Sequence, residues 1–198
     1  IGERRGALSK KTGPSLKFTL NAFESSVEEA LDSVISEEFF RKLIAKDAGL
    51  WKAGLGDKKQ IKGSRGWTIL PYLVEEHRDE INDFAAEVES AGFRHAVLLG
   101  MGGSSLGPEV MKMTFGKITG FPELHVLDST DPAQVKTFEN KVDLKNTLFI
   151  VSSKSGSTLE PNILTQYFFD RVTQLVGAEE AGARFIAITD PGSKMQQV

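Results

Sequence analysis

The chain has 198 residues, of which 40% are hydrophobic and 26% are charged, and its formal net charge is −3. This composition is typical of a globular protein with a sizeable core, and the net charge provides no overall attraction to nucleic acid. The absence of cysteine excludes disulfides and thiolate metal sites, and no stretch approaches the 18 apolar residues of a membrane span. We therefore expect a cytoplasmic protein that contacts neither membrane nor nucleic acid, and that binds an anion only through local groups.

The N-terminal third predicts an arm followed by a small helical region. Residues 1–16 are rich in Lys, Arg, Gly and Ser without periodicity, which is typical of a flexible linker. Apolar residues at helical spacing then predict one helix around Phe23–Val34 and a second around Phe39–Ile44, capped by Ser36. We interpret residues 17–66 as an N-terminal helical extension.

Two features of the middle of the chain have structural interpretations. Trp51 lies in a Gly/Lys loop and is interpreted as an aromatic anchor against the core. Residues 70–91 carry apolar side chains at helical spacing and predict one long helix, with His77 packed on its apolar face. His95 and His125 stand at the beginnings of predicted strands, opposite to the end where such sheets bind ligands. We assign none of the three histidines a catalytic role and predict no metal site.

From Arg94 onward, apolar strand-like runs alternate with helical patterns. This alternation predicts an α/β fold with a doubly wound parallel sheet flanked by helices on both faces, in a domain of residues 67–198. The four predicted strands are Ala96–Leu99, Leu124–Leu127, Thr147–Val151 and Phe185–Ile188.

A glycine-rich turn follows the first of these strands, and a helix is expected from about Gly107. The segment 100–107 reads GMGGSSLG, and its glycines allow a close approach of the backbone to a bound group. Asp128 ends the next strand and resembles the acidic residue that holds an adenosine ribose. The dinucleotide pattern G-x-G-x-x-G nevertheless fails at Ser105, and no Walker A lysine is present.

A hydroxyl-rich turn follows the strand Thr147–Val151. Five of the seven residues 152–158 carry hydroxyl groups, and an amphipathic helix is predicted to begin at Ser157 or Thr158, with a capping box formed by Ser157 and Glu160. Helix capping needs only one or two hydroxyls, whereas the amides and the dipole of a helix N-terminus favour an anion. The turn therefore predicts a phosphate site at the carboxyl edge of the sheet.

Together, GMGGSSLG and SSKSGSTLEP resemble the two turns of the sugar isomerase (SIS) domain, a flavodoxin-like three-layer sandwich. The pair is most similar to the glucose-6-phosphate isomerases, and the likeness extends over roughly residues 66–198. The longer form GMGGSSLGPEV is similar to the isomerase half of transaldolase/glucose-6-phosphate isomerase fusion proteins. The chain departs from the family at Ser105, where Asp is common, and at Ser157, where Thr is usual.

The resemblance implies which residues bind the substrate. Gly103 and Ser104 would contact the sugar. A second set would cradle the 6-phosphate, with the Lys154 side chain either pairing with it or pointing to solvent, and Glu160 would serve only the helix start. The phosphate set is Ser153, Lys154, Ser155, Gly156, Ser157 and Thr158.

The resemblance also implies an activity. The family moves a proton between C1 and C2 of the open-chain sugar through an enediolate, without metal or organic cofactor, using Glu, Arg, His and Lys in motifs that follow the matched segment. We therefore expect a homodimeric isomerase of sugar phosphates, with no catalytic residue in these 198 residues. A sugar-phosphate-sensing regulatory module and an isomerase of another phosphosugar are the alternatives.

Overall fold

The computed structural model describes residues 19, 21–36, 38–50 and 66–197, so the predicted linker at 1–16 and Trp51 lie outside the described residues. The chain falls into two compact units, Ile1–His77 and Arg78–Val198. The predicted domain bounds at residues 16 and 66 stay predictions.

The first unit contains the helices expected for the extension. They are α2 (Glu24–Ser36) and α3 (Phe39–Ile44), followed by 3₁₀ turns at Ala48–Leu50 and Gly66–Ile69. Ser36 does not cap α3, because its Oγ donates to the carbonyl of Ser33 at 3.2 Å. Glu38 precedes α3 instead, in the left-handed conformation at φ 53°. Apart from Ala48, the apolar side chains of α2, α3 and these turns are exposed or only half-buried.

The predicted long helix over residues 70–91 is wrong, because the structure breaks it into α5 (Leu70–Glu76) and α6 (Arg78–Ser90). His77 terminates α5, with its amide donating to the Leu73 carbonyl at 3.0 Å. Asp79 and Glu80 then provide the acidic first turn that stabilises a new helix N-terminus. His77 is also exposed in the structure and not packed on an apolar face.

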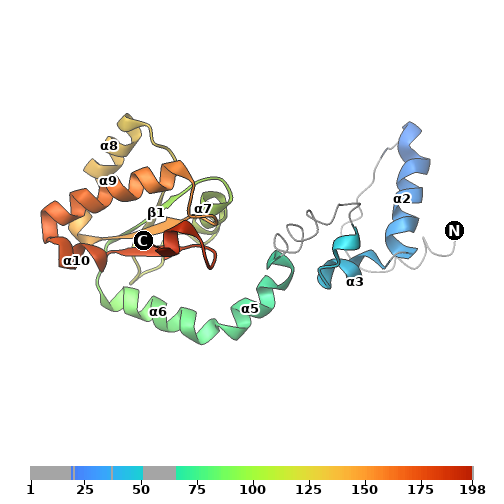
Figure 1. The fold of residues 1–198 in the computed structure, drawn as a ribbon, viewed down its shortest axis with the longest axis horizontal. Coiled ribbons are helices and arrows are strands. Elements are labelled where there is room, and N and C mark those ends of the chain that lie inside the picture. The colour runs from blue at the N-terminus through green and yellow to red at the C-terminus, as the bar shows by residue number, and fades with distance from the viewer. Residues whose placement is uncertain (1–18, 20, 37, 51–65, 198) are drawn as a thin grey trace. The chain divides into compact units, whose positions relative to one another are not determined.

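The second unit contains the predicted sheet, which confirms the α/β fold (Figure 1). All pairings are parallel and the strand order is β2-β1-β3-β4. Because β1 and β3 are neighbours, Gly100 lies in register with Ser152. The strands are β1 (His95–Gly100), β2 (Glu123–Leu127), β3 (Thr147–Ser152) and β4 (Phe185–Ile188).

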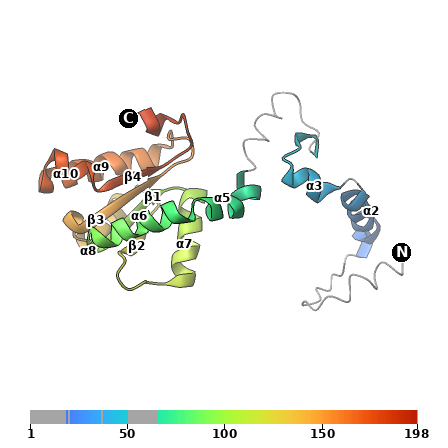
Figure 2. The same ribbon diagram turned by 90° about the horizontal axis from the view of Figure 1, so that it is seen from below.

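Helices lie on both faces of this sheet. Figure 1 shows α8 and α9 on one side and α6 on the other, and Figure 2, seen from below, shows α6 crossing in front of the strands. Helix α7 packs on β1 and β2. The bounds are α7 (Gly103–Phe115), α8 (Pro132–Lys141), α9 (Leu159–Val176) and α10 (Ala178–Gly182), with a 3₁₀ turn at Lys194–Gln197.

The core lies between the sheet and the helices α8, α9 and α10. Alternate residues of the strands, among them Val97, Leu99 and Phe149, meet Phe138 of α8 and Phe168 of α9. The Phe168 ring is fully buried and packs edge-on to Phe138 and tilted against Phe149, with centroid distances of 5.9 and 5.2 Å. These aromatic contacts clamp both helices to the middle of the sheet.

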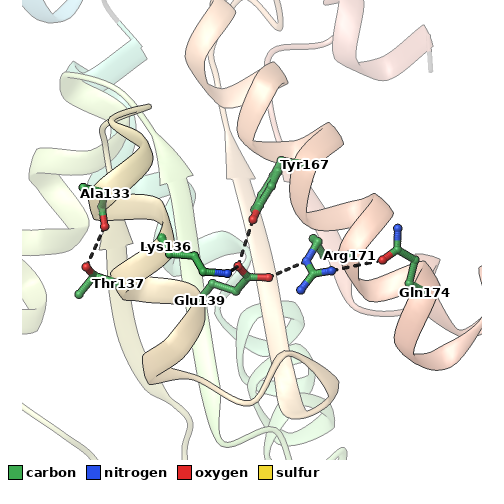
Figure 3. A network of polar contacts seen from close by, with 7 residues as sticks. All are labelled: Ala133, Lys136, Thr137, Glu139, Tyr167, Arg171 and Gln174. Carbon is green, nitrogen blue, oxygen red and sulfur yellow. Dashed lines mark hydrogen bonds and ion pairs between the residues drawn. The ribbon is translucent and has the colours of Figure 1, made fainter.

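A buried carboxylate also joins α8 to α9 (Figure 3). The side chain of Glu139 is 6% exposed and accepts hydrogen bonds from Arg171 Nε at 2.6 Å and from the Tyr167 hydroxyl at 3.0 Å. Lys136 Nζ approaches the same carboxylate at 3.5 Å. Burial by itself would raise the pKa of Glu139, but these hydrogen bonds and charges outweigh it and hold that pKa below its ordinary value of 4.5. The carboxylate therefore stays ionised inside the fold.

Candidate functional site

The two Gly/Ser turns lie side by side at the carboxyl edge of the sheet, as predicted. They follow the neighbouring strands β1 and β3, whose last residues Gly100 and Ser152 are register partners. A Cβ added to Gly100 would lie 3.2 Å from both the Ser152 carbonyl oxygen and the Ser104 Cβ. Glycine at this position therefore lets the first turn press against the second.

The glycine turn enters helix α7 earlier than expected. The helix begins at Gly103 and not near Gly107, so Gly103 and Ser104 belong to its first turn. Ser105 is buried, and its Oγ donates to the Gly102 carbonyl at 3.0 Å, which holds the turn in shape. Gly103 is exposed and Ser104 half-buried, and both lie just after the carboxyl end of β1.

Ser153 is the internal scaffold of the second turn. It is 3% exposed, and its Oγ accepts from the Gly156 amide at 3.2 Å and donates to Thr158 Oγ1 at 3.3 Å. Its own amide donates to the Ile188 carbonyl at 3.0 Å, which ties the turn to β4. Ser153 therefore fixes the shape of the turn from inside.

Gly156 is held in a position that only glycine fits. Its φ is 64°, and an added Cβ would lie 2.5 Å from the Met195 amide nitrogen and 2.8 Å from the Met195 Cβ. The Asn162 Nδ2 donates to its carbonyl at 3.3 Å. The backbone of the turn at Gly156 thus packs closely against the backbone of residues 194–195.

The hydroxyls that reach the surface are those of Ser155, Ser157 and Thr158. The Oγ atoms of Ser155 and Ser157 are 2.9 Å apart, and the Ser157 amide donates to Ser155 Oγ at 3.2 Å. Both serines are exposed and Thr158 is half-buried. The Lys154 side chain is exposed too, whereas its carbonyl accepts from the Asp190 amide at 3.2 Å. Three hydroxyls are therefore clustered where a ligand can reach them.

The predicted start of the helix after this turn is wrong by one or two residues. Helix α9 begins at Leu159, with Thr158 as its N-cap residue, and the Thr158 side chain makes no capping hydrogen bond. The predicted capping box of Ser157 with Glu160 is therefore not formed, because Ser157 lies outside the cap and bonds to Ser155 instead. The first amides of this 18-residue helix point toward the hydroxyl turn and favour an anion.

The structure adds residues that the sequence pattern did not reveal. Thr189 follows β4, and its Oγ1 donates to the Lys154 carbonyl at 3.4 Å and shares a hydrogen bond of 2.7 Å with Ser193 Oγ. Asn162 lies one turn into α9 and braces Gly156. Only the pairing of β4 with β3 brings residues 188–190 to this turn, so no local signal marks them.

The parallel sheet and its two adjacent Gly/Ser turns place the chain in the class of α/β sugar isomerase domains. A family model described as phosphoglucose isomerase matches residues 58–198. The chain therefore belongs to the phosphoglucose isomerase family.

Similar proteins agree with this family. A glucose-6-phosphate isomerase of Carboxydothermus hydrogenoformans is 35% identical over 147 residues, covering 68% of this chain and 30% of that protein. One from Chlamydia muridarum is 38% identical over 104 residues, covering 52% and 20%. The chain thus spans less than a third of either relative.

Solved structures show the same fold. The crystal structure of a glucose-6-phosphate isomerase from Chlamydia trachomatis matches with a TM-score of 0.54 at 27% identity, covering 77% of this chain and 28% of that one. A hypothetical protein from Thermus thermophilus matches with a TM-score of 0.61 at 28% identity, covering 90% and 39%. In the described part of the chain, no helix has the length and apolar character needed to cross a membrane.

Proposed function

We propose that this chain supplies the phosphate- and sugar-binding half of an enzyme that interconverts glucose 6-phosphate and fructose 6-phosphate. The observation that supports this proposal is the cluster of exposed hydroxyls before α9, beside the glycine turn that opens α7. In this proposal the enzyme is cytoplasmic and homodimeric, and its reaction uses neither a metal ion nor an organic cofactor.

The 6-phosphate binds at the second turn. Ser155, Ser157 and Thr158 donate hydroxyl hydrogen bonds, and the first amides of α9 add theirs along the helix dipole. Each hydrogen bond to a charged group contributes about 1.5–3 kcal/mol, and the helix terminus adds about 0.3–1 kcal/mol. Three or four such contacts, less the cost of association, support affinities from micromolar to millimolar.

Ser153, Lys154 and Gly156 support this site in different ways. Ser153 and Gly156 are buried and hold the turn in shape, while the exposed Lys154 adds a positive charge near the ester. Gly103 and Ser104 face the same edge from the neighbouring strand and contact the sugar. One loop therefore holds the phosphate and the other the hydroxyl groups of the ring.

The proton transfer between C2 and C1 needs a base that this chain does not supply. Glu160, in the first turn of α9, would repel the phosphate and is unsuited to that role. We therefore expect the 198 residues to bind the sugar phosphate weakly and to show no turnover. Efficient isomerisation by this chain alone would contradict this division of roles.

Two alternatives have less support. A sugar-phosphate-sensing module would bind its ligand at the same two turns without catalysing a reaction. The relatives from Carboxydothermus and Chlamydia, however, are both named as isomerases. An isomerase of another phosphosugar differs only in the sugar contacts. Competition of pentose and amino-sugar phosphates against glucose 6-phosphate separates that case.

The test compares binding of glucose 6-phosphate with binding of inorganic phosphate, which has only the phosphate, and of glucose, which has only the sugar. Replacing Ser155 and Ser157 together by alanine should weaken binding of glucose 6-phosphate and of inorganic phosphate about 10-fold or more, measured by calorimetry. Replacing Ser104 by alanine should weaken binding of glucose 6-phosphate but leave inorganic phosphate unchanged. Ser90→Ala, an exposed serine on α6, is the matched control and should change neither. Equal losses for glucose and glucose 6-phosphate in the double variant would contradict the phosphate assignment.

A further inference from the structure

Two histidines and a glutamate converge at the amino ends of β1 and β2, opposite to the proposed sugar-phosphate site. His95 and Glu123 are register partners on neighbouring strands, and His125 follows two residues after Glu123. Side chains two residues apart point to the same face of a sheet, so all three share one face. One ligand atom from each lies within 4.8 Å of the other two, and this is the one such group found in the described part of the chain.

The distances in this cluster fit a small coordination sphere. His95 Nδ1 lies 3.1 Å from His125 Nε2, and Glu123 Oε1 lies 3.9 Å from the same nitrogen. Tetrahedral zinc with bonds of about 2.0–2.1 Å separates its ligand atoms by about 3.3 Å. These two distances bracket that separation, so a metal can replace the hydrogen bond between the rings with side-chain shifts of about 1 Å or less.

We propose that His95, Glu123 and His125 bind a divalent transition metal of the Zn²⁺ type. Two imidazoles and one carboxylate are a ligand set that zinc uses in proteins, with a fourth position left for water. The site would tie the edge strand β2 to β1 at the ends remote from the proposed substrate turns. The length of β1, which has 6 residues, separates the two places by about 16 Å.

The surrounding packing orients the ligands before metal binds. His125 is 5% exposed, and its ring packs edge-on to Phe138 of α8 with a centroid distance of 5.6 Å. The rings of His95 and His125 lie 5.2 Å apart and are tilted by 48°. Because Phe138 belongs to the core, the His125 ring has little freedom to turn away. Most of the ordering that a metal would require is therefore already present.

Two open clefts border the cluster. An open cleft of about 540 Å³ is lined by His125, and another of about 640 Å³ is lined by His95 and Glu123. Lys112 and Lys141 line the first cleft, while Arg94 and Lys117 line the second. These charges oppose a cation, and their long side chains can extend into solvent. We therefore expect the affinity for a metal to be moderate, and weaker than that of a site with the same ligands but without cationic neighbours.

The experiment titrates the metal-free chain with Zn²⁺ by calorimetry and with Co²⁺ by visible absorption, which reports tetrahedral coordination. His95→Gln and Glu123→Gln should each lower the affinity at least about 10-fold and reduce the rise in melting temperature that Zn²⁺ causes. The chain has three histidines and no cysteine, so His77→Gln is a matched control that removes the remaining imidazole. It should bind as the wild type does.

Each other outcome overturns the proposal. No saturable Zn²⁺ binding by the wild type would do so, as would equal affinity in the wild type and His95→Gln. Loss of binding in His77→Gln would place the metal elsewhere. Glu123 has a 42% exposed side chain, so Glu123→Gln is expected to fold even where His95→Gln does not, and circular dichroism checks both.

Discussion

Replacing Gly156 by alanine should destabilise the second unit through two separate effects. Its φ of 64° lies in the left-handed region, which costs a residue with a Cβ about 1–2 kcal/mol. The new Cβ would also lie 2.5 Å from the Met195 amide nitrogen, so residues 194–195 must move. Overpacking of this kind typically costs about 1–3 kcal/mol more. We expect a total loss of about 2–5 kcal/mol in the free energy of unfolding, from these two ranges added.

Gly92 offers a matched control for the first effect alone. Its φ is 70°, and an added Cβ would have nothing within 4 Å, so Gly92→Ala carries the backbone strain without the collision. Urea unfolding followed by circular dichroism should show a larger loss for Gly156→Ala than for Gly92→Ala, by about 1–3 kcal/mol. Equal losses in the two variants would refute the close approach of Met195 to the turn.

Two further predictions concern the core. Glu139→Gln should lower stability at neutral pH by about 1–3 kcal/mol, because Arg171 and Tyr167 lose a charged acceptor. Since the folded pKa of Glu139 lies below its ordinary value of 4.5, its carboxylate stabilises the fold above that pH. This contribution is lost as the pH falls through the folded pKa of Glu139. The free energies of unfolding of wild type and variant, measured in urea, should therefore converge in acid. A difference between them that does not change with pH would contradict this. Phe168→Ala should cost about 3–5 kcal/mol by leaving a cavity, whereas Phe169→Ala, at a side chain 37% exposed, should cost about 1–2 kcal/mol in the same assay. Equal costs would contradict the packing.

Local patterns were sufficient for most of the secondary structure in the second unit. Phe185–Ile188 was predicted without error, and Thr147–Val151 to within one residue. Both are short apolar runs bounded by polar turns, and burial on both faces of a parallel sheet leaves little else for such runs to form.

The misses arise where local signals compete or where partners are distant. Helical periodicity continues through His77, but the acidic residues after it start a new helix there. Ser153 and Ser157 look alike in sequence, yet one is buried as scaffold and the other is exposed. Their difference depends on contacts with residues 188 and 155, of which only the second is local. The predicted roles of the turn residues in binding a sugar phosphate stay predictions. The resemblance to transaldolase fusion proteins stays one as well.

The sequence alone determined the alternation of strands and helices, the two Gly/Ser turns and the family, because these depend on side-chain periodicity and on short motifs. The tertiary structure decided which residues meet. The strand order β2-β1-β3-β4 places Gly100 against Ser152 at one end of the sheet and His95 against Glu123 at the other. Such pairings arise from burying the whole sheet between helices, which is a property of the packed chain and is not encoded in any one segment.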